Sequence, residues 1–191
     1  QRVQHANIGA CLMKNPEHVA TLYQSMQSST TLPVSIKCRI GVDDHASYSD
    51  LKSFVDTVAS AGCRSFVVHA RAAWLQGVNP KQNRDVPPLN YKAVYELKRA
   101  IPALEIVING GIVTYDGFRQ HLSQVDGVMV GRLAIDDPYA LHTIACKIDE
   151  VETVSRYELL VQYMQLLEEG LSPKEKTGAM RHVVNIFSGL P

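Results

Sequence analysis

Glycine and polar residues follow four short apolar segments of this chain, where they could contact a ligand. Gly110 and Gly111 follow one segment, and Gly131 with Arg132 follows another. Glycine removes the side chain, so backbone N–H groups can approach a phosphate closely, and arginine adds a charge-assisted hydrogen bond. The candidates for contact with a phosphate-bearing ligand are Lys37 (or Arg39 on the same segment), His69, Asn109, Gly110, Gly111, Gly131 and Arg132.

Each candidate also has a purely structural interpretation. The glycines would fit tight turns between a strand and a helix, Lys37 would reach solvent from a strand end, and His69 would fit a satisfied position in the core. The ligand interpretation is favoured because all four segments end in this way and two of them are followed by glycine. In a parallel β/α barrel this end of the strands carries the active site.

A second signal is the positive charge of the segment 64–99. Its seven basic residues are opposed by only two acidic ones, which leaves a net charge of +5 in a chain with 19 basic and 19 acidic residues. Arg71, Lys81 and Arg84 lie in the loop of this segment, and Trp74 lies in the same loop. Such a loop could contact RNA phosphates and stack a base. A solvated helix face with a few loop charges would give the same count.

The elements that must position these residues alternate regularly along the chain. Strands are expected at 33–40, 65–69, 105–109 and 127–130, where the runs are short, apolar and mostly β-branched. Helices are expected at 16–28, around 51–60, 91–99, 115–122 and 138–146. This alternation predicts a parallel sheet, either a barrel or a doubly wound sheet.

The pattern changes after residue 149. No further strand is expected, and two helices are predicted at 153–169 and 173–187. We therefore expect residues 1–147 to be part of a barrel and residues 148–191 to form a small helical domain.

The composition argues against several classes of protein. The balanced charge gives no overall attraction to nucleic acid or membranes, and the four cysteines form no CxxC pair or zinc spacing. No apolar run approaches the about 18 residues of a membrane helix, and no signal peptide is seen. We expect a cytoplasmic protein with reduced thiols, no metal ion and no membrane partner.

Eight segments share a pattern with one known family. They are 2–4 (RVQ), 9–13 (GACLM), 37–41 (KCRIG), 68–71 (VHAR), 83–84 (NR), 87–89 (PPL), 109–112 (NGGI) and 126–132 (DGVMVGR). Together they resemble the A-type tRNA-dihydrouridine synthases over almost the whole chain. The NGG and GR segments occur in many phosphate-binding barrels, whereas the combination of HAR, NR and PPL is far more specific.

The resemblance implies the C-terminal half of a (β/α)8 TIM barrel, followed by an incomplete helical tRNA-binding domain. It implies reduction of uridine to dihydrouridine in tRNA, with FMN as cofactor and NADPH as reductant. Lys37 and His69 would then contact the flavin, and the NGG and GR segments would hold its phosphate end. Lys81 and Arg84 would contact tRNA, and Arg71 would touch the target nucleotide or the flavin.

One departure from the family pattern concerns the catalytic acid. The family has a cysteine in a GCPS segment, which we expect just before Gln1, so we interpret the chain as a fragment that is inactive alone. Two alternatives stay open at this point. One is a phosphate-binding TIM-barrel isomerase or synthase of small-molecule metabolism, and the other is a module that only binds RNA or supports structure.

Overall fold

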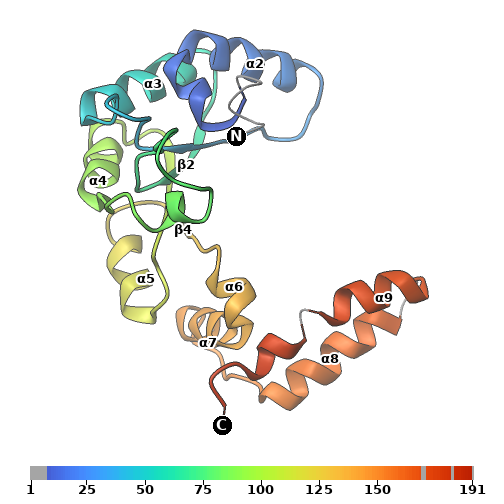
Figure 1. Ribbon diagram of the computed structural model, residues 1–191. Coiled ribbons are helices and arrows are strands. Elements are labelled where there is room, and N and C mark those ends of the chain that lie inside the picture. The colour runs from blue at the N-terminus through green and yellow to red at the C-terminus, as the bar shows by residue number, and fades with distance from the viewer. Residues whose placement is uncertain (1–7, 169–170, 182, 191) are drawn as a thin grey trace. The chain divides into compact units, whose positions relative to one another are not determined.

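The structure is a computed structural model that describes residues 8–168, 171–181 and 183–190 (Figure 1). Its Cα positions group into two units. The first comprises the chain up to Ile112 together with Phe118–Met129. The second comprises Val113–Gly117 together with Val130 and the residues that follow it.

A sheet of four strands forms the centre of the first unit. β1 (Ile36–Arg39) pairs with β2 (Ser65–His69), β2 with β3 (Glu105–Asn109), and β3 with β4 (Gly127–Met129). All three pairings are parallel, which confirms the parallel α/β sheet predicted from the sequence. Strands that follow one another in the chain are neighbours in the sheet, as in a barrel or one half of one.

Strand β1 is shorter than the predicted strand 33–40. Pro33 has no N–H to donate to a neighbouring strand. The Val34 N–H donates to Gln27 Oε1 at 3.2 Å, so the backbone here is bonded to a helix side chain and not to β2. Regular pairing therefore begins only at Ile36.

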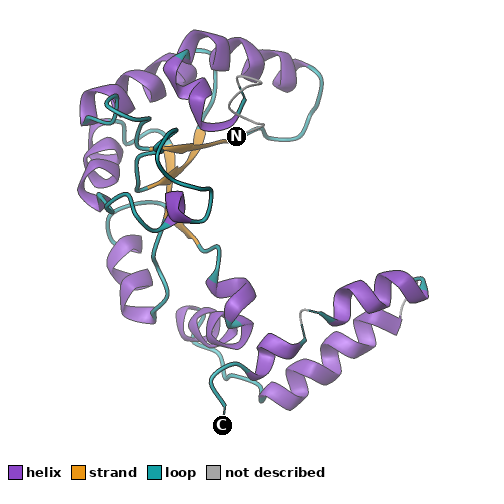
Figure 2. Ribbon diagram, in the orientation of Figure 1, coloured by secondary structure: helices purple, strands orange, loops and turns teal. Residues whose placement is uncertain are grey.

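Three helices lie along one side of the strands (Figure 2): α2 (Pro16–Ser28), α3 (Tyr48–Ser60) and α4 (Tyr91–Ala100). Each begins where a side chain caps the helix. Asn15, Ser47 and Asn90 each accept a hydrogen bond from the backbone N–H three residues later. A fourth helix, α5 (Tyr115–Leu122), precedes β4.

The two faces of the sheet differ in polarity. Phe66, Val68, Ile106 and Ile108 are fully buried. Because side chains alternate along a strand, the neighbouring positions point to the opposite face. That face carries Lys37, Arg39, Val67, His69, Val107 and Asn109. The core of the first unit thus lies between the sheet and its helices, and the polar residues lie on the other face.

The second unit is helical. Its helices are α6 (Leu133–Asp136), α7 (Pro138–Ile148), α8 (Arg156–Glu168), α9 (Pro173–Met180) and the 3-10 helix η3 (Val184–Phe187). Helices α8 and α9 lie side by side (Figure 1), and the Tyr163 hydroxyl donates to the Ala179 carbonyl at 3.1 Å. The Arg156 guanidinium lies 4.2 Å from the Tyr139 ring centroid and also donates to the Ile186 carbonyl.

Two predicted helix boundaries differ from the structure. The helix predicted from 153 begins at Arg156, because Ser155 and Glu158 cap each other's backbone N–H groups there. The helix predicted over 173–187 is wrong in its second half: α9 ends at Met180, and η3 begins at Val184. Gly178 is close to this end and is a poor helix former.

The predicted domain boundary after residue 147 stays a prediction. It falls inside the second unit, which already includes Val130. Among the described residues, no helix combines the length and the apolar character needed to cross a membrane.

Candidate flavin and RNA site

Strand register places four residues in one row at the carboxyl edge of the sheet. Arg39 pairs with His69, His69 with Asn109, and Asn109 with Met129. The next row on the same face lies two residues earlier in each strand. It comprises Lys37, Val67, Val107 and Gly127. Polar groups therefore gather at the last level of the strands, where ligands bind in barrel enzymes.

Lys37 and Asn109 are joined directly across the sheet. Lys37 Nζ donates to Asn109 Oδ1 at 3.3 Å, and Asn109 Nδ2 donates to the Met129 carbonyl at 2.7 Å. Partial burial and then the charge of Arg39 lower the pKa of Lys37 below its ordinary value. Two cations close together on one face of a sheet favour an anionic ligand.

Gly110 and Gly111 follow Asn109 with positive φ angles of 120° and 67°. A Cβ on Gly110 would lie 2.7 Å from His69 Cδ2, and a Cβ on Gly111 would lie 2.9 Å from Leu89 Cδ1. Packing against His69 therefore disfavours a side chain at Gly110, and the positive φ together with Leu89 disfavours one at Gly111. The two glycines thus fit a tight turn after the strand, as the purely structural interpretation expects. The same turn leaves the backbone without side chains that would shield it from a ligand.

Gly131 and Arg132 belong to the second unit, at the start of α6. A Cβ on Gly131 would have no neighbour within 4 Å among the described residues, so packing does not demand this glycine. Strand β4 ends two residues earlier, at Met129. The predicted GR segment thus follows the strand end and is not part of it.

Three arginines, one at the end of β1 and two in the loop after β2, lie close together. Arg39 Nη1 donates to the Asn83 carbonyl at 2.9 Å, and Arg71 Nη1 donates to the Asp85 and Pro87 carbonyls. Burial, and then the charges of Arg71 and Arg84, lower the pKa of Arg39. We call Arg39, Arg71 and Arg84 the arginine cluster.

The arginine cluster carries charge and hydrogen-bonding capacity that the described residues leave unused. None of its three guanidinium groups forms an ion pair with a carboxylate in the described part of the chain. Arg71 Nε is buried and has no hydrogen-bond partner among these residues. A buried donor without a partner costs about 1–3 kcal/mol, so an acceptor at this place would be stabilising.

A groove of about 990 Å³ adjoins the arginine cluster. Arg39 and Arg84 line it together with Asn79, Asn83 and other residues of the loop after β2. Lys81 is exposed and does not line the groove, although its N–H donates to Asn79 Oδ1 at 2.9 Å in the same loop. Of the three predicted RNA contacts, the structure brings Arg71 and Arg84 together and leaves Lys81 apart.

Sequence reasoning missed Tyr91 in this region and considered Arg39 only as an alternative to Lys37. Arg39 was visible in the KCR segment, and the two-residue period of a strand already places it on the same face as Lys37. The Tyr91 hydroxyl donates to the Gly110 carbonyl at 2.7 Å. No sequence pattern marked Tyr91, because it reads as an ordinary residue in the first turn of a helix.

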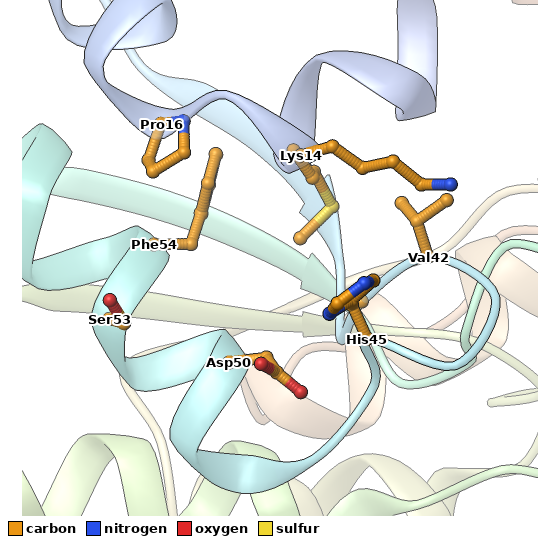
Figure 3. Close-up of a pocket in the computed structure, with 9 residues that line it drawn as sticks. Lys14, Pro16, Val42, His45, Asp50, Ser53 and Phe54 are labelled. Atoms are coloured by element: carbon orange, nitrogen blue, oxygen red, sulfur yellow. The ribbon is translucent and has the colours of Figure 1, made fainter.

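A smaller pocket of about 230 Å³ lies beside the loop after β1 (Figure 3). Two of its polar side chains, Lys14 and Asp50, already bond to other groups of the chain. Lys14 forms an ion pair with Asp43 at 2.9 Å, and the Asp50 carboxylate accepts from the Ser47 N–H at 2.9 Å. Figure 3 shows Asp50 and Ser53 on α3 with His45 on the preceding loop. We assign this pocket to the structure and not to the site.

Comparison with known proteins gives the family. A family model described as dihydrouridine synthase matches residues 1–191. The chain belongs to the dihydrouridine synthase family. This confirms the resemblance found in the sequence and agrees with the parallel sheet, since the fold of the family is a TIM barrel.

Curated dihydrouridine synthases align with the whole chain. The tRNA-dihydrouridine(20/20a) synthase of Synechocystis sp. is 46% identical over 193 residues, covering 100% of this chain and 58% of the relative. The enzymes of the same name from Xanthomonas campestris and Shewanella oneidensis are 44% and 43% identical, with 57% and 58% of their lengths covered. The chain therefore spans a little over half the length of these dihydrouridine synthases.

Proposed function

We propose that this chain is the part of a tRNA-dihydrouridine synthase that holds the phosphate end of the flavin and one side of the bound RNA. The whole enzyme would reduce uridine to dihydrouridine in tRNA, with FMN as cofactor and NADPH as reductant. The proposal rests on the arginine cluster, which shares Arg39 with the polar row Arg39–His69–Asn109, in a chain of this family.

The strand ends have the chemistry that FMN requires. Lys37 and His69 lie on the polar face of the sheet, where they would contact the flavin. Asn109, Gly110, Gly111, Gly131 and Arg132 would hold the phosphate end. FMN, when bound, supplies the electrons for the reduction. The role of the chain is to bind and orient it.

The arginine cluster and its groove support an RNA contact. Phosphate oxygens in the groove would contact Arg39 and Arg84 and offset the mutual repulsion of the three guanidinium groups. A tRNA must present one extruded uridine to the flavin while its backbone rests on the surrounding rim. Lys81 would act as an outer contact with the same backbone.

The remaining part of the barrel would come from elsewhere in the enzyme. Within the described residues, β1 and β4 are the edges of the sheet, and a closed barrel of the family has eight strands. The proton donor would also lie outside this chain, as the cysteine expected before Gln1. Burial raises the pKa of the Cys38 thiol to about 12, which makes it a poor proton donor at neutral pH.

The competing function, an isomerase or synthase of small molecules, would use the same glycine-bearing strand ends. That function would not explain why three arginines cluster at this place. The relatives are also named for an activity on tRNA. Because tRNA is the substrate that we propose, we also propose the cytoplasm as the location.

The direct test uses the full-length enzyme with an unmodified tRNA transcript, FMN and NADPH. We expect the purified enzyme to contain FMN and one uridine of the tRNA to gain two hydrogens, as measured by mass spectrometry of the nucleosides. Omission of NADPH is the control. An enzyme that contains no flavin and leaves the tRNA unchanged would overturn the proposal.

A further inference from the structure

We infer that Tyr91 is a positioning residue for the backbone that receives the flavin phosphate. This inference rests on the proposed function, because that proposal places a phosphate at Gly110 and Gly111. It adds a role for a helix residue that does not itself touch the ligand.

The contact is a hydrogen bond from the first turn of α4 to the glycine turn. The Tyr91 hydroxyl donates to the Gly110 carbonyl at 2.7 Å. A Cβ on Gly111 would lie 3.2 Å from the same hydroxyl, so the tyrosine is in close contact with both glycines.

The glycine turn needs such an anchor. Both residues have positive φ, and glycine backbones pass between conformations more easily than those of other residues. A peptide unit between two glycines can therefore rotate and exchange the directions of its C=O and N–H. A bond to the carbonyl holds one of these orientations.

The orientation that Tyr91 selects directs a donor away from the helix. In a trans peptide, the Gly110 carbonyl and the Gly111 N–H belong to one planar unit and point in opposite directions. With the carbonyl held by Tyr91, the Gly111 N–H points away from it. That N–H donates to no other group within the described residues, so it is available to a phosphate oxygen.

The Tyr91 ring is itself fixed by its neighbours. The ring of His121, a buried residue of α5, meets the Tyr91 ring edge-on with centroids 4.5 Å apart. His121 Nδ1 in turn hydrogen-bonds the Tyr95 hydroxyl at 2.6 Å. Tyr95 is a matched control, because it is the same residue type on the same helix and its hydroxyl bonds to His121 instead of the glycine turn.

The test compares FMN with riboflavin, which lacks the phosphate, on full-length enzyme freed of its flavin. We expect Tyr91→Phe to weaken FMN binding about three- to tenfold, as the loss of one neutral hydrogen bond predicts, and to leave riboflavin binding unchanged. Unchanged riboflavin binding also shows that the fold survives. Tyr95→Phe should retain the wild-type ratio of the two affinities.

The possible results separate the two proposals. Suppose that wild type prefers FMN over riboflavin. If Tyr91→Phe keeps this full preference, or lowers the affinity for FMN and riboflavin equally, the positioning role is wrong and the flavin site stands. If wild type binds FMN no more tightly than riboflavin, the phosphate site is wrong and the positioning role falls with it. Selective loss of FMN affinity in Tyr91→Phe alone supports both.

Discussion

Arg71 shows how a single residue links the loop to the site. One end of its guanidinium is bonded to the Asp85 and Pro87 carbonyls, so the side chain shapes the loop after β2. Its Nε is buried and unpartnered among the described residues. A sequence can indicate that an arginine near a strand end contacts a ligand. It cannot show which of its donors the chain itself has already used.

The arginine cluster gives a prediction for RNA binding that distinguishes Arg84 from Lys81. Arg84 lines the groove, whereas Lys81 does not. In the full-length enzyme, Arg84→Ala should weaken tRNA binding and reduce the slope of log affinity against log salt by about one for each phosphate that the arginine neutralises. Lys81→Ala should have the smaller effect. Binding isotherms at several salt concentrations measure both.

Lys92 provides the control for this experiment, because its side chain is 83% exposed on α4. Lys92→Ala should leave the salt slope as in wild type, and flavin content should be unchanged in all three variants. An Arg84→Ala enzyme with the wild-type slope would show that the groove is not an RNA contact.

His121 predicts a pH dependence of stability. Burial lowers the pKa of His121 below its ordinary value of 6.5. The unfolded chain therefore binds a proton at a higher pH than the folded chain does. The stabilisation is complete above about pH 6.5 and is lost as the pH falls below that value toward the folded pKa. Urea unfolding at a series of pH values measures this loss.

Two histidine variants make the pH experiment specific. In His121→Gln, the fall in unfolding free energy through this pH range should be smaller than in wild type. The exposed His18 serves as the comparison, and His18→Gln should keep the wild-type profile. Parallel profiles for wild type and His121→Gln would contradict the assignment.

Among the helices and strands, the sequence predicted the elements that follow the repeating apolar pattern. It missed the element boundaries that depend on single contacts. Alternating apolar runs located the four strands of the described residues and most of the helices, but they did not indicate the short helix α6. The start of β1 was missed because it depends on a bond from the Val34 N–H to Gln27. The end of α9 was missed because the apolar pattern continues past Met180 into η3, although the helix does not.

Asp126 is the residue that ties the beginnings of two strands together. Its carboxylate accepts from the Ile106 N–H at 2.8 Å and from Lys98 Nζ at 2.7 Å. Partial burial alone would raise the pKa of Asp126, but these two donors together hold it below its ordinary value. The Asp126 N–H also donates to the Ile106 carbonyl at 3.0 Å.

We therefore expect Asp126→Asn to lower the free energy of unfolding by about 1–2 kcal/mol, because charge-assisted hydrogen bonds become neutral ones. Chemical denaturation of the full-length enzyme measures the difference. Asp56→Asn is the comparison, since Asp56 makes a surface pair with Lys52 that should contribute little. Equal stability of wild type and Asp126→Asn would rule out this role.

At the scale of the whole molecule, the sequence indicated the family and the parallel sheet, and both are confirmed. It could not indicate the division into units, in which Val130 already belongs with the helices. That grouping depends on packing between segments distant in the chain, which no local pattern records.

The edges of the sheet predict the behaviour of the isolated chain. Within the described residues, β1 and β4 each have one unpaired side. Unpaired edges of a buried parallel sheet favour pairing with another chain. We expect the 191-residue chain to self-associate in sedimentation velocity experiments, whereas the full-length enzyme should sediment as a defined species. A stable monomer with one cooperative melting transition would argue against an incomplete barrel.

We propose that the strand ends of this chain bind the phosphate end of FMN, and a crystal structure of the flavin-loaded full-length enzyme would show whether they do. We expect the phosphate within hydrogen-bond distance of the Gly111 N–H and the Arg132 guanidinium, with Lys37 and His69 against the flavin. A phosphate bound away from both Gly111 and Arg132 would contradict it.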